Sequence, residues 1–175
     1  MKQDTIDFIA NCIVCAHLKP DCRKKTDFKH NHKAPLSRVN QRLSIDCITG
    51  LPKTEQGMTC CLTILDEFSF FIQCIAIKAK DPETIAKAMV QHWFAWMGVP
   101  EEIHSDQGTD TDSATVLEVC RILNIAKART PSYSPWANGG AELANKAIGD
   151  LLRGMTFYGA QDQWDSLLPF VVLSY

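Results

Sequence analysis

The segments Ser105–Thr109 (SDQGT) and Ser134–Glu142 (SPWANGGAE) decide the fold of this chain. They hold Asp106 and Glu142, which 35 intervening residues separate. A third acid, Asp46, lies upstream in the segment LSIDCITGLP. Two Mg²⁺ or Mn²⁺ ions about 4 Å apart require hard oxygen ligands from separate chain elements, with coordination positions left for water and phosphate. Three acids on three elements therefore predict a two-metal site.

Strand-like and helix-like segments alternate around these acids. Short runs rich in β-branched and aromatic residues predict strands in residues 43–51, 59–66, 70–77 and 101–106, and one that begins at residue 126. Apolar residues at helical spacing predict helices over residues 81–98, 113–125, 141–155 and 162–175. This order predicts an α/β fold with a mixed five-stranded sheet flanked by helices. It places Asp46 in the first strand and Asp106 at the end of the fourth.

Several residues near these acids have a structural interpretation. Asp66, between the second and third strands, is interpreted as a turn residue and not as a catalytic one. His104 is interpreted as a hydrogen-bonded strand residue and not as a ligand. The helix over residues 81–98 begins with Asp81 as its N-cap. Its apolar stripe, which includes Trp93 and Trp96, is expected to pack in the core and not to stack on bases.

The helix expected over residues 141–155 divides into an apolar face and a polar face. The polar face carries Glu142, Asn145, Lys146 and Arg153. Lys and Arg bind phosphate through their charge, so a candidate metal ligand and two candidate phosphate ligands share one surface. An ordinary solvated helix face would explain part of this pattern, but it would not explain the SPWANGG segment directly before the helix.

The order of the three acids, the SDQGT motif and the SPxxNG turn resemble the catalytic core of retroviral and long-terminal-repeat retrotransposon integrases, nearest to the gypsy type. The resemblance covers roughly residues 39–175 and implies a ribonuclease H-like fold. It also implies metal-assisted phosphoryl transfer, in which the DNA 3′ ends of the element are processed and then joined to target DNA. By this resemblance Asp46, Asp106 and Glu142 hold two Mg²⁺ or Mn²⁺ ions. The DNA contacts that it implies are Asn138, Asn145, Lys146 and Arg153.

The N-terminal part of the chain differs from the rest in charge. Residues 1–42 hold nine Lys or Arg against four Asp, a net charge of +5, while the whole chain carries −2 and the remainder therefore −7. A basic arm suits contact with phosphate, although a solvated linker explains the same charges. We interpret residues 1–20 as a helical remnant of the integrase zinc-binding domain and residues 21–41 as a basic linker. Residues 42–175 are the catalytic core, which ends inside a helix short of the family's usual end.

The cysteines are expected to be reduced. Five of the eight, at positions 47, 60, 61, 74 and 120, lie in apolar runs where free thiols act as small hydrophobic groups. Cys12 and Cys15 form a CxxC motif, which is half of a tetrahedral zinc site. The family supplies the other half as two upstream histidines, which this sequence lacks, so a remnant without zinc is favoured.

The chain lacks both an apolar run of 18 residues and a secretory signal, so we expect an intracellular protein, in the nucleus, without a membrane partner. The resemblance implies DNA as partner, both element ends and target, and a homo-oligomer when the protein is full length.

Two other functions remain open. A catalytically inactive or domesticated module that binds nucleic acid or a protein would have no use for three acids that repel DNA. A different ribonuclease H-like nuclease or transposase is disfavoured by the 35-residue interval and by SDQGT. Three positions depart from the usual family pattern: Asp110-Thr111 after SDQGT, Trp136 before the ANG turn, and Leu143 directly after the glutamate.

Overall fold

Five strands form one mixed sheet. The computed structural model describes residues 2–14, 35–105, 113–129, 139–157, 159 and 161–175. Its strands are β1 (Arg42–Ile48), β2 (Cys60–Asp66), β3 (Ile72–Ile77), β4 (Glu102–Ser105) and β5 (Ala126–Arg129), in the order β3-β2-β1-β4-β5. The β3-β2-β1 part is antiparallel, while β4 and β5 run parallel to β1. The expected mixed five-stranded sheet is confirmed.

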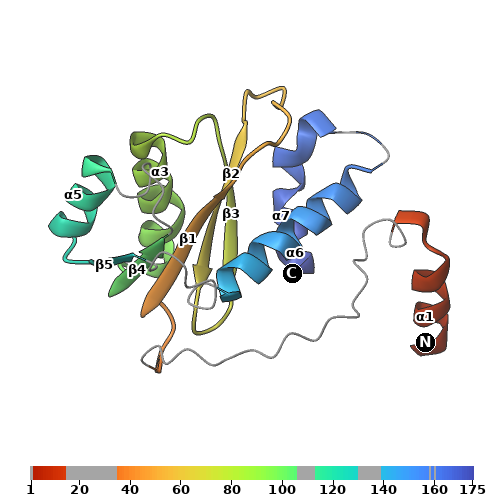
Figure 1. Cartoon of the computed structure of the whole chain (residues 1–175), viewed down its shortest axis with the longest axis horizontal. Helices are drawn as coiled ribbons and strands as arrows, with labels where there is room; N and C mark the ends of the chain where they lie inside the picture. The colour runs from red at the N-terminus through yellow and green to blue at the C-terminus, as the bar shows by residue number, and fades with distance from the viewer. Residues whose placement is uncertain (1, 15–34, 106–112, 130–138, 158, 160) are drawn as a thin grey trace.

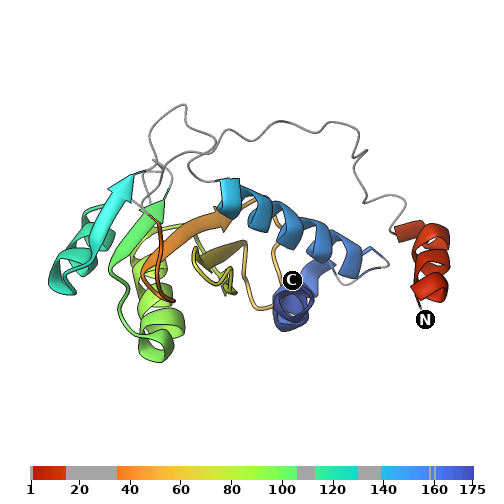
Figure 2. The same cartoon turned by 90° about the horizontal axis from the view of Figure 1, so that it is seen from below.

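Helices flank this sheet. One continuous helix comprises α3 (Pro82–Met89), η1 (Val90–Phe94) and α4 (Ala95–Met97), and the others are α1 (Lys2–Asn11), α5 (Ala114–Ile122), α6 (Gly139–Met155), η3 (Gln161–Gln163) and α7 (Trp164–Ser174). Figure 1 shows α3 and α5 on one side of the sheet and α6 and α7 on the other. Seen from below, α6 crosses over β1 (Figure 2). None of the helices in the described residues is long and apolar enough to cross a membrane.

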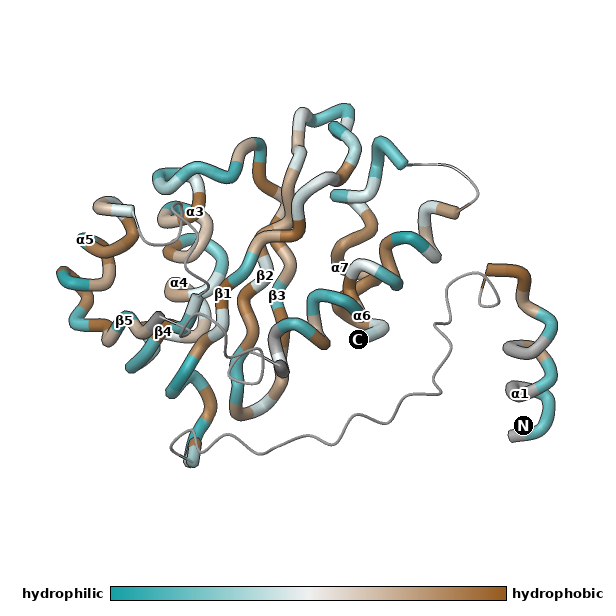
Figure 3. The backbone as a smooth tube through the Cα atoms, viewed as in Figure 1, coloured by the Kyte–Doolittle hydropathy of each residue, from teal (hydrophilic) through white to brown (hydrophobic). Residues whose placement is uncertain are grey.

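Each face of the sheet has its own core, because successive side chains of a strand point to opposite faces. The core on the α3 and α5 side includes Leu43, Ile45, Leu62, Ile64, Ile85, Met89, Ile103 and Val116. The core on the α6 and α7 side includes Cys61, Leu65, Ile72, Ala144, Ile148, Leu152, Trp164 and Leu168. Apolar and polar residues alternate along α6, as its hydropathy colouring shows (Figure 3). The α6 helix therefore covers its core with one face and presents the other outward.

The helix over residues 82–97 differs from the expected one at its C-terminal end. Trp93 is fully buried as predicted, but Trp96 is 81% exposed, so its predicted place in the core is wrong. The reason is the π-helical turn from Val90 to Phe94. A π-turn holds an extra residue, so the residues beyond it are rotated out of the α-helical stripe.

Asp66 has the predicted role in the turn that joins β2 to β3. It is fully buried, and its carboxylate accepts hydrogen bonds from the backbone N–H of Ser69 at 2.9 Å and of Asn40 at 3.0 Å. The Asn40 side chain accepts from the Trp93 indole N–H at 2.9 Å and donates to the Met97 carbonyl at 3.0 Å. The segment that leads into β1 is thereby fixed to the turn and to the end of α4.

Candidate active site

Strand β1 carries the first predicted acid on the face toward α6. Leu43 and Ile45 point into the core under α3 and α5, so the alternate residues Arg42, Ser44 and Asp46 face the other way. Asp46 is half-buried, and its Oδ1 accepts a hydrogen bond from the N–H of Cys47 at 2.7 Å. Its carboxylate is therefore held on the surface that α6 covers.

Asn145 of α6 connects that helix to Asp46. Its Nδ2 donates to Asp46 Oδ2 at 2.6 Å, and its Oδ1 accepts from the hydroxyl of Thr63 on β2 at 2.7 Å. Thr63 stands directly opposite Asp46 in the β1–β2 register. The predicted DNA contact of Asn145 stays a prediction, because the structure shows its amide engaged within the protein.

Glu142 lies in the first turn of α6, and its side chain is exposed. Residues three apart on a helix are surface neighbours, about 5–6 Å between Cβ atoms. Glu142 is therefore one turn from Asn145, which bonds to Asp46. Two of the three predicted acids therefore lie on contacting elements, Asp46 on β1 and Glu142 on α6.

The third acid, Asp106, follows the last residue of β4 and lies outside the described residues, as does Asn138. Strand β4 pairs with β1 so that Ser105 stands opposite Ile45, the residue before Asp46. Among the residues that the structure describes, no three His, Cys, Asp or Glu side chains form a group that could hold a metal ion. The joint arrangement of Asp46, Asp106 and Glu142 stays a prediction.

The two predicted cationic DNA contacts lie on the outer side of α6. Lys146 and Arg153 are both exposed, and Arg153 donates through Nε to the Gly149 carbonyl at 3.2 Å. Arg153 Nη2 also lies 3.2 Å from Asp150 Oδ1. At exposed sites such pairs contribute little, so both cations are accessible to a polyanion.

Comparison with known proteins identifies the family of this chain. Residues 37–135, more than half of the chain, match the family model described as the integrase core domain. The chain belongs to the integrase core domain family. Its relatives include the retrovirus-related Pol polyprotein from transposon 412 of Drosophila melanogaster, 24% identical over 75% of this chain, and the Pro-Pol polyprotein of simian foamy virus type 3, 32% identical over 74%. This chain spans only 10% and 11% of the length of these polyproteins.

Solved structures with the same fold include a simian T-cell lymphotropic virus intasome in complex with PP2A regulatory subunit B56 gamma, with a TM-score of 0.71 and 18% identity. That match covers 99% of this chain and 60% of the other. The catalytic core domain of BIV integrase matches with a TM-score of 0.63 and 18% identity, over 77% of this chain and 82% of the other. The fold is therefore ribonuclease H-like, as the resemblance implied. The finer expectation of a gypsy type stays a prediction.

This integrase core domain also contains a charged cluster that was not predicted from the sequence. It lies on the same face of β1 as Asp46. Arg42 Nε donates to Glu102 Oε2 at 2.7 Å, and His104 Nε2 lies 2.7 Å from Glu102 Oε1. The Ser44 hydroxyl donates to Glu67 Oε1 at 2.6 Å. Burial alone would raise the pKa of Glu102, but hydrogen bonds from Arg42 and His104 outweigh it and lower that pKa. His104 is thus the hydrogen-bonded strand residue that was predicted.

The five thiols predicted to be free are free: Cys47, Cys60, Cys61, Cys74 and Cys120. Cys12 is also free. A hydrogen bond with Cys74, followed by burial, raises the pKa of the Cys61 thiol far above its usual value. Burial likewise raises the pKa of Cys120. Protonated, enclosed thiols behave as hydrophobic core groups. Cys15 lies outside the described residues, so zinc binding by Cys12 and Cys15 stays a prediction.

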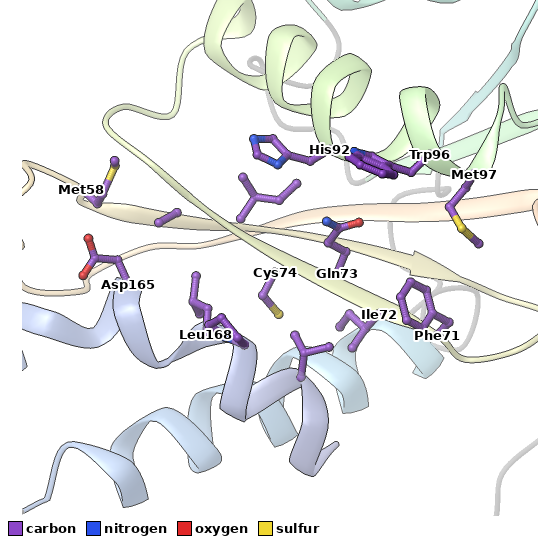
Figure 4. A pocket seen from close by; sticks show the side chains of 14 residues that line it. Met58, Phe71, Ile72, Gln73, Cys74, His92, Trp96, Met97, Asp165 and Leu168 are labelled. Carbon is purple, nitrogen blue, oxygen red and sulfur yellow. The ribbon is translucent and has the colours of Figure 1, made fainter.

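A groove of about 780 Å³ runs along the outer edge of β3. Figure 4 shows Gln73 on the side of the helix that carries His92 and Trp96, and Cys74 on the side of α7, which carries Leu168. Within the described residues, no strand pairs with β3 on this side. The groove therefore has the edge of the sheet as its floor and a helix as each wall.

Proposed function

We propose that this integrase core domain catalyses phosphoryl transfer on DNA, processing the 3′ ends of an element and joining them to target DNA. Two Mg²⁺ or Mn²⁺ ions held by Asp46, Asp106 and Glu142 would serve this reaction. One observation carries the proposal: the Asp46 carboxylate is oriented by Asn145, one helical turn from Glu142 on α6. Two acids far apart in sequence are thus carried by two elements that contact each other, β1 and α6.

The donor set suits these ions. Mg²⁺ and Mn²⁺ prefer carboxylate oxygen, and Mg²⁺ sites commonly use one or two carboxylates together with water and substrate phosphate. Asp46 is half-buried and Glu142 is exposed, so a bound ion there would keep access to solvent and to DNA. Asp106, which directly follows β4, would supply the third carboxylate.

Bound ions of this kind lower the pKa of an attacking hydroxyl and stabilise negative charge on the transferred phosphoryl group. The chain's own residues have two tasks around that chemistry. Asp46 on β1 and Glu142 on α6 would supply carboxylates to the ions, with the plane of the Asp46 carboxylate fixed by Cys47 and Asn145. Lys146 and Arg153, exposed on α6, bind backbone phosphates and position the DNA on this surface.

The relatives support DNA as the partner. They are Pol polyproteins of retroviruses and of a transposon, and one structural neighbour is an intasome. Sequence-independent contacts to phosphate make DNA affinity fall steeply with salt, which separates this partner from an uncharged one.

Strand transfer of labelled terminal-repeat DNA in Mn²⁺ tests the proposal, with wild type compared with Glu142→Gln. Asp150→Asn is the matched control, because Asp150 is another acid on α6, two turns beyond Glu142. We expect product from wild type and from the control and none from Glu142→Gln. Equal product from all three proteins would overturn the assigned role of Glu142.

A non-catalytic module would give a different result in a binding assay. Mn²⁺ titration followed by electron paramagnetic resonance measures free and bound ion directly. The proposed site binds Mn²⁺ and loses it in Asp46→Asn, whereas a module that only binds nucleic acid shows no dependence on Asp46.

We further propose that the protein acts as a homo-oligomer and that the groove along β3 is where two copies meet. Exposed apolar side chains line this groove, including Trp96 at 81% and Phe71 at 46% exposure. Large exposed apolar patches mark interaction sites, and a two-fold contact uses the same patch on both copies. An unpaired strand edge between two helices offers such a self-complementary surface.

Light scattering across a range of protein concentrations tests this assembly. Trp96→Glu is expected to shift the population to monomer. Ile122→Glu, at a 66% exposed position on α5, is the matched control and should assemble as wild type does. Wild-type assembly by Trp96→Glu would exclude the groove as the contact.

A further inference from the structure

Thr63 is a buried polar residue of β2, a strand whose other side chains apart from Asp66 are apolar. It lies in the middle of β2, the strand whose seven residues are all buried, and it is 2% exposed. Its hydroxyl is 2.7 Å from Asn145 Oδ1 and 3.1 Å from the backbone carbonyl of Asp46. A buried hydroxyl without partners would be costly, so these contacts define what Thr63 does.

The order of donors and acceptors fixes the orientation of the Asn145 amide. An ionised carboxylate can only accept hydrogen bonds, so the amide group that lies 2.6 Å from Asp46 Oδ2 must be the NH₂. The amide oxygen then faces Thr63, whose hydroxyl donates its one proton to this closer acceptor. With the amide reversed, its oxygen would face the Asp46 carboxylate and its NH₂ would face Thr63. The Asp46 carboxylate therefore selects this orientation of Asn145, and the Thr63 hydroxyl supplies the donor that the amide oxygen then needs.

We propose that Thr63 is a positioning residue for the metal site: acting through Asn145, its hydroxyl holds the Asp46 carboxylate in the orientation that binds the divalent ion. This inference rests on the proposed function, because it assigns a task to Thr63 only if Asp46 binds metal. Partners beyond the ligands themselves commonly orient them and tune metal affinity.

Threonine suits this task better than serine. Its β-branched side chain has few allowed χ1 rotamers in a strand, so the direction of the hydroxyl is fixed by the backbone. The position opposite Asp46 in the β1–β2 register directs that hydroxyl at the place where β1 and α6 meet. Valine has the same shape without the hydroxyl, and alanine removes the hydroxyl without adding bulk.

Two measurements test the role of Thr63 in the full chain. The first is Mn²⁺ affinity, measured by electron paramagnetic resonance for wild type, Thr63→Val, Thr63→Ala and Thr63→Ser. The second is the ¹H–¹⁵N spectrum of the Asn145 side-chain NH₂ without metal, which reports whether one of its protons is held by Asp46. Thr59→Val is the matched control, since the Thr59 hydroxyl donates to the Lys78 carbonyl at 2.8 Å, away from Asp46.

We expect roughly tenfold weaker Mn²⁺ binding in Thr63→Val and Thr63→Ala, the low end of the range for residues that orient a metal ligand. The chemical-shift separation of the two Asn145 amide protons should change in both variants, and Thr63→Ser should recover most of both signals. Thr59→Val should leave both unchanged. Because Thr63→Ala introduces no bulk, it decides the matter if Thr63→Val does not fold.

Two failures are distinguishable. If wild type binds Mn²⁺ and Asp46→Asn does not, but Thr63→Val and Thr63→Ala bind with wild-type affinity, the positioning role is overturned and the proposed function stands. If wild type binds no Mn²⁺, or Asp46→Asn binds equally well, the proposed function is overturned together with the positioning role.

Discussion

The two faces of strand β1 are built from opposite kinds of residue. Toward α3 and α5 the strand presents Leu43 and Ile45, which are fully buried among apolar side chains. Toward α6 it presents Arg42, Ser44 and Asp46, whose side chains bond to groups on β4, on the turn after β2 and on α6. One face supplies stability through burial, and the other holds charge in place. The strand thus separates the two tasks by alternation alone.

The polar face is costly to build, since a buried charge is stable only when it is paired and hydrogen-bonded. Most of its groups meet that condition. Among the described residues, Arg42 Nη1 is the buried side-chain nitrogen without a hydrogen-bond partner, and it lies 3.8 Å from Glu67 Oε2. A fold selected only for stability would place apolar residues here, so this face points to function.

The largest expected effect is on the chemistry of the polar face. Asp46→Asn keeps the size of the side chain but removes its charge. A metal ligand contributes several kcal/mol of charge stabilisation, so strand transfer in Mn²⁺ should fall at least about a hundredfold. The melting temperature should stay close to that of wild type. Loss of stability in proportion to loss of activity would contradict the separation of tasks between the two faces.

The apolar face should respond in the opposite way. Ile64→Ala truncates a fully buried side chain of β2 in the core under α3 and α5. Buried Ile→Ala substitutions leave a cavity, so denaturant titration should show a loss of about 3 kcal/mol in the free energy of unfolding. Mn²⁺ affinity of the folded protein should not change. Ile122→Ala, at an exposed position on α5, should cost much less, and a loss of Mn²⁺ binding in Ile64→Ala would couple the two faces.

Local pattern was sufficient to predict most of the fold. The strands and helices have clear periodicity, and the N-cap at Asp81 forms as expected, accepting from the Thr84 N–H at 3.0 Å. The predictions fail where fewer apolar residues of a helix are buried than its sequence pattern suggests. Ile122 on α5 is 66% exposed and Leu143 on α6 is 59% exposed, although both are apolar residues of the predicted helices. Burial there depends on which neighbours the helix contacts, and a local pattern does not contain that information.

The site was less predictable than the fold, for a topological reason. The motifs indicated the three acids, but the groups that orient Asp46 come from distant segments. Asn145 and Thr63 are 82 residues apart, and Arg42 and Glu102 are 60 apart. These pairs meet because β2, β1 and β4 are neighbours in the sheet and α6 packs on β1 and β2. Strand order and helix placement are properties of the whole fold.

The third effect in order of size is on stability and concerns the charged cluster around Arg42. Arg42→Met should reduce the free energy of unfolding at pH 7 by about 2 kcal/mol, since it leaves Glu67 and Glu102 without their cation. The loss is below that of a fully enclosed pair, because Glu102 is partly exposed and keeps His104. Unfolding in urea at several pH values measures it, with the exposed Arg121→Met as control.

The pH dependence of this loss follows from the lowered pKa of Glu102. A carboxyl group with a lowered pKa in the folded state stabilises the fold above its ordinary pKa, about 4.3 for Glu, and loses that effect as pH falls through the lowered value. The difference between wild type and Arg42→Met should therefore be complete at pH 7 and shrink below about pH 4. A difference that stayed constant down to pH 3 would show that Arg42 acts by packing alone.

The smallest expected effect is on DNA binding. It distinguishes the outer surface of α6 from that of α3. Lys146 on α6 and Lys87 on α3 are both exposed, but only Lys146 shares a helix with Glu142. Lys146→Gln should weaken DNA binding modestly and reduce the slope of log affinity against log salt by about 1, the effect of one lost phosphate contact. Lys87→Gln removes the same charge and should leave the slope unchanged. Fluorescence anisotropy with labelled duplex DNA at several salt concentrations measures both. Because net charge falls equally in the two variants, equal slopes would mean that DNA responds to overall charge and not to the surface of α6.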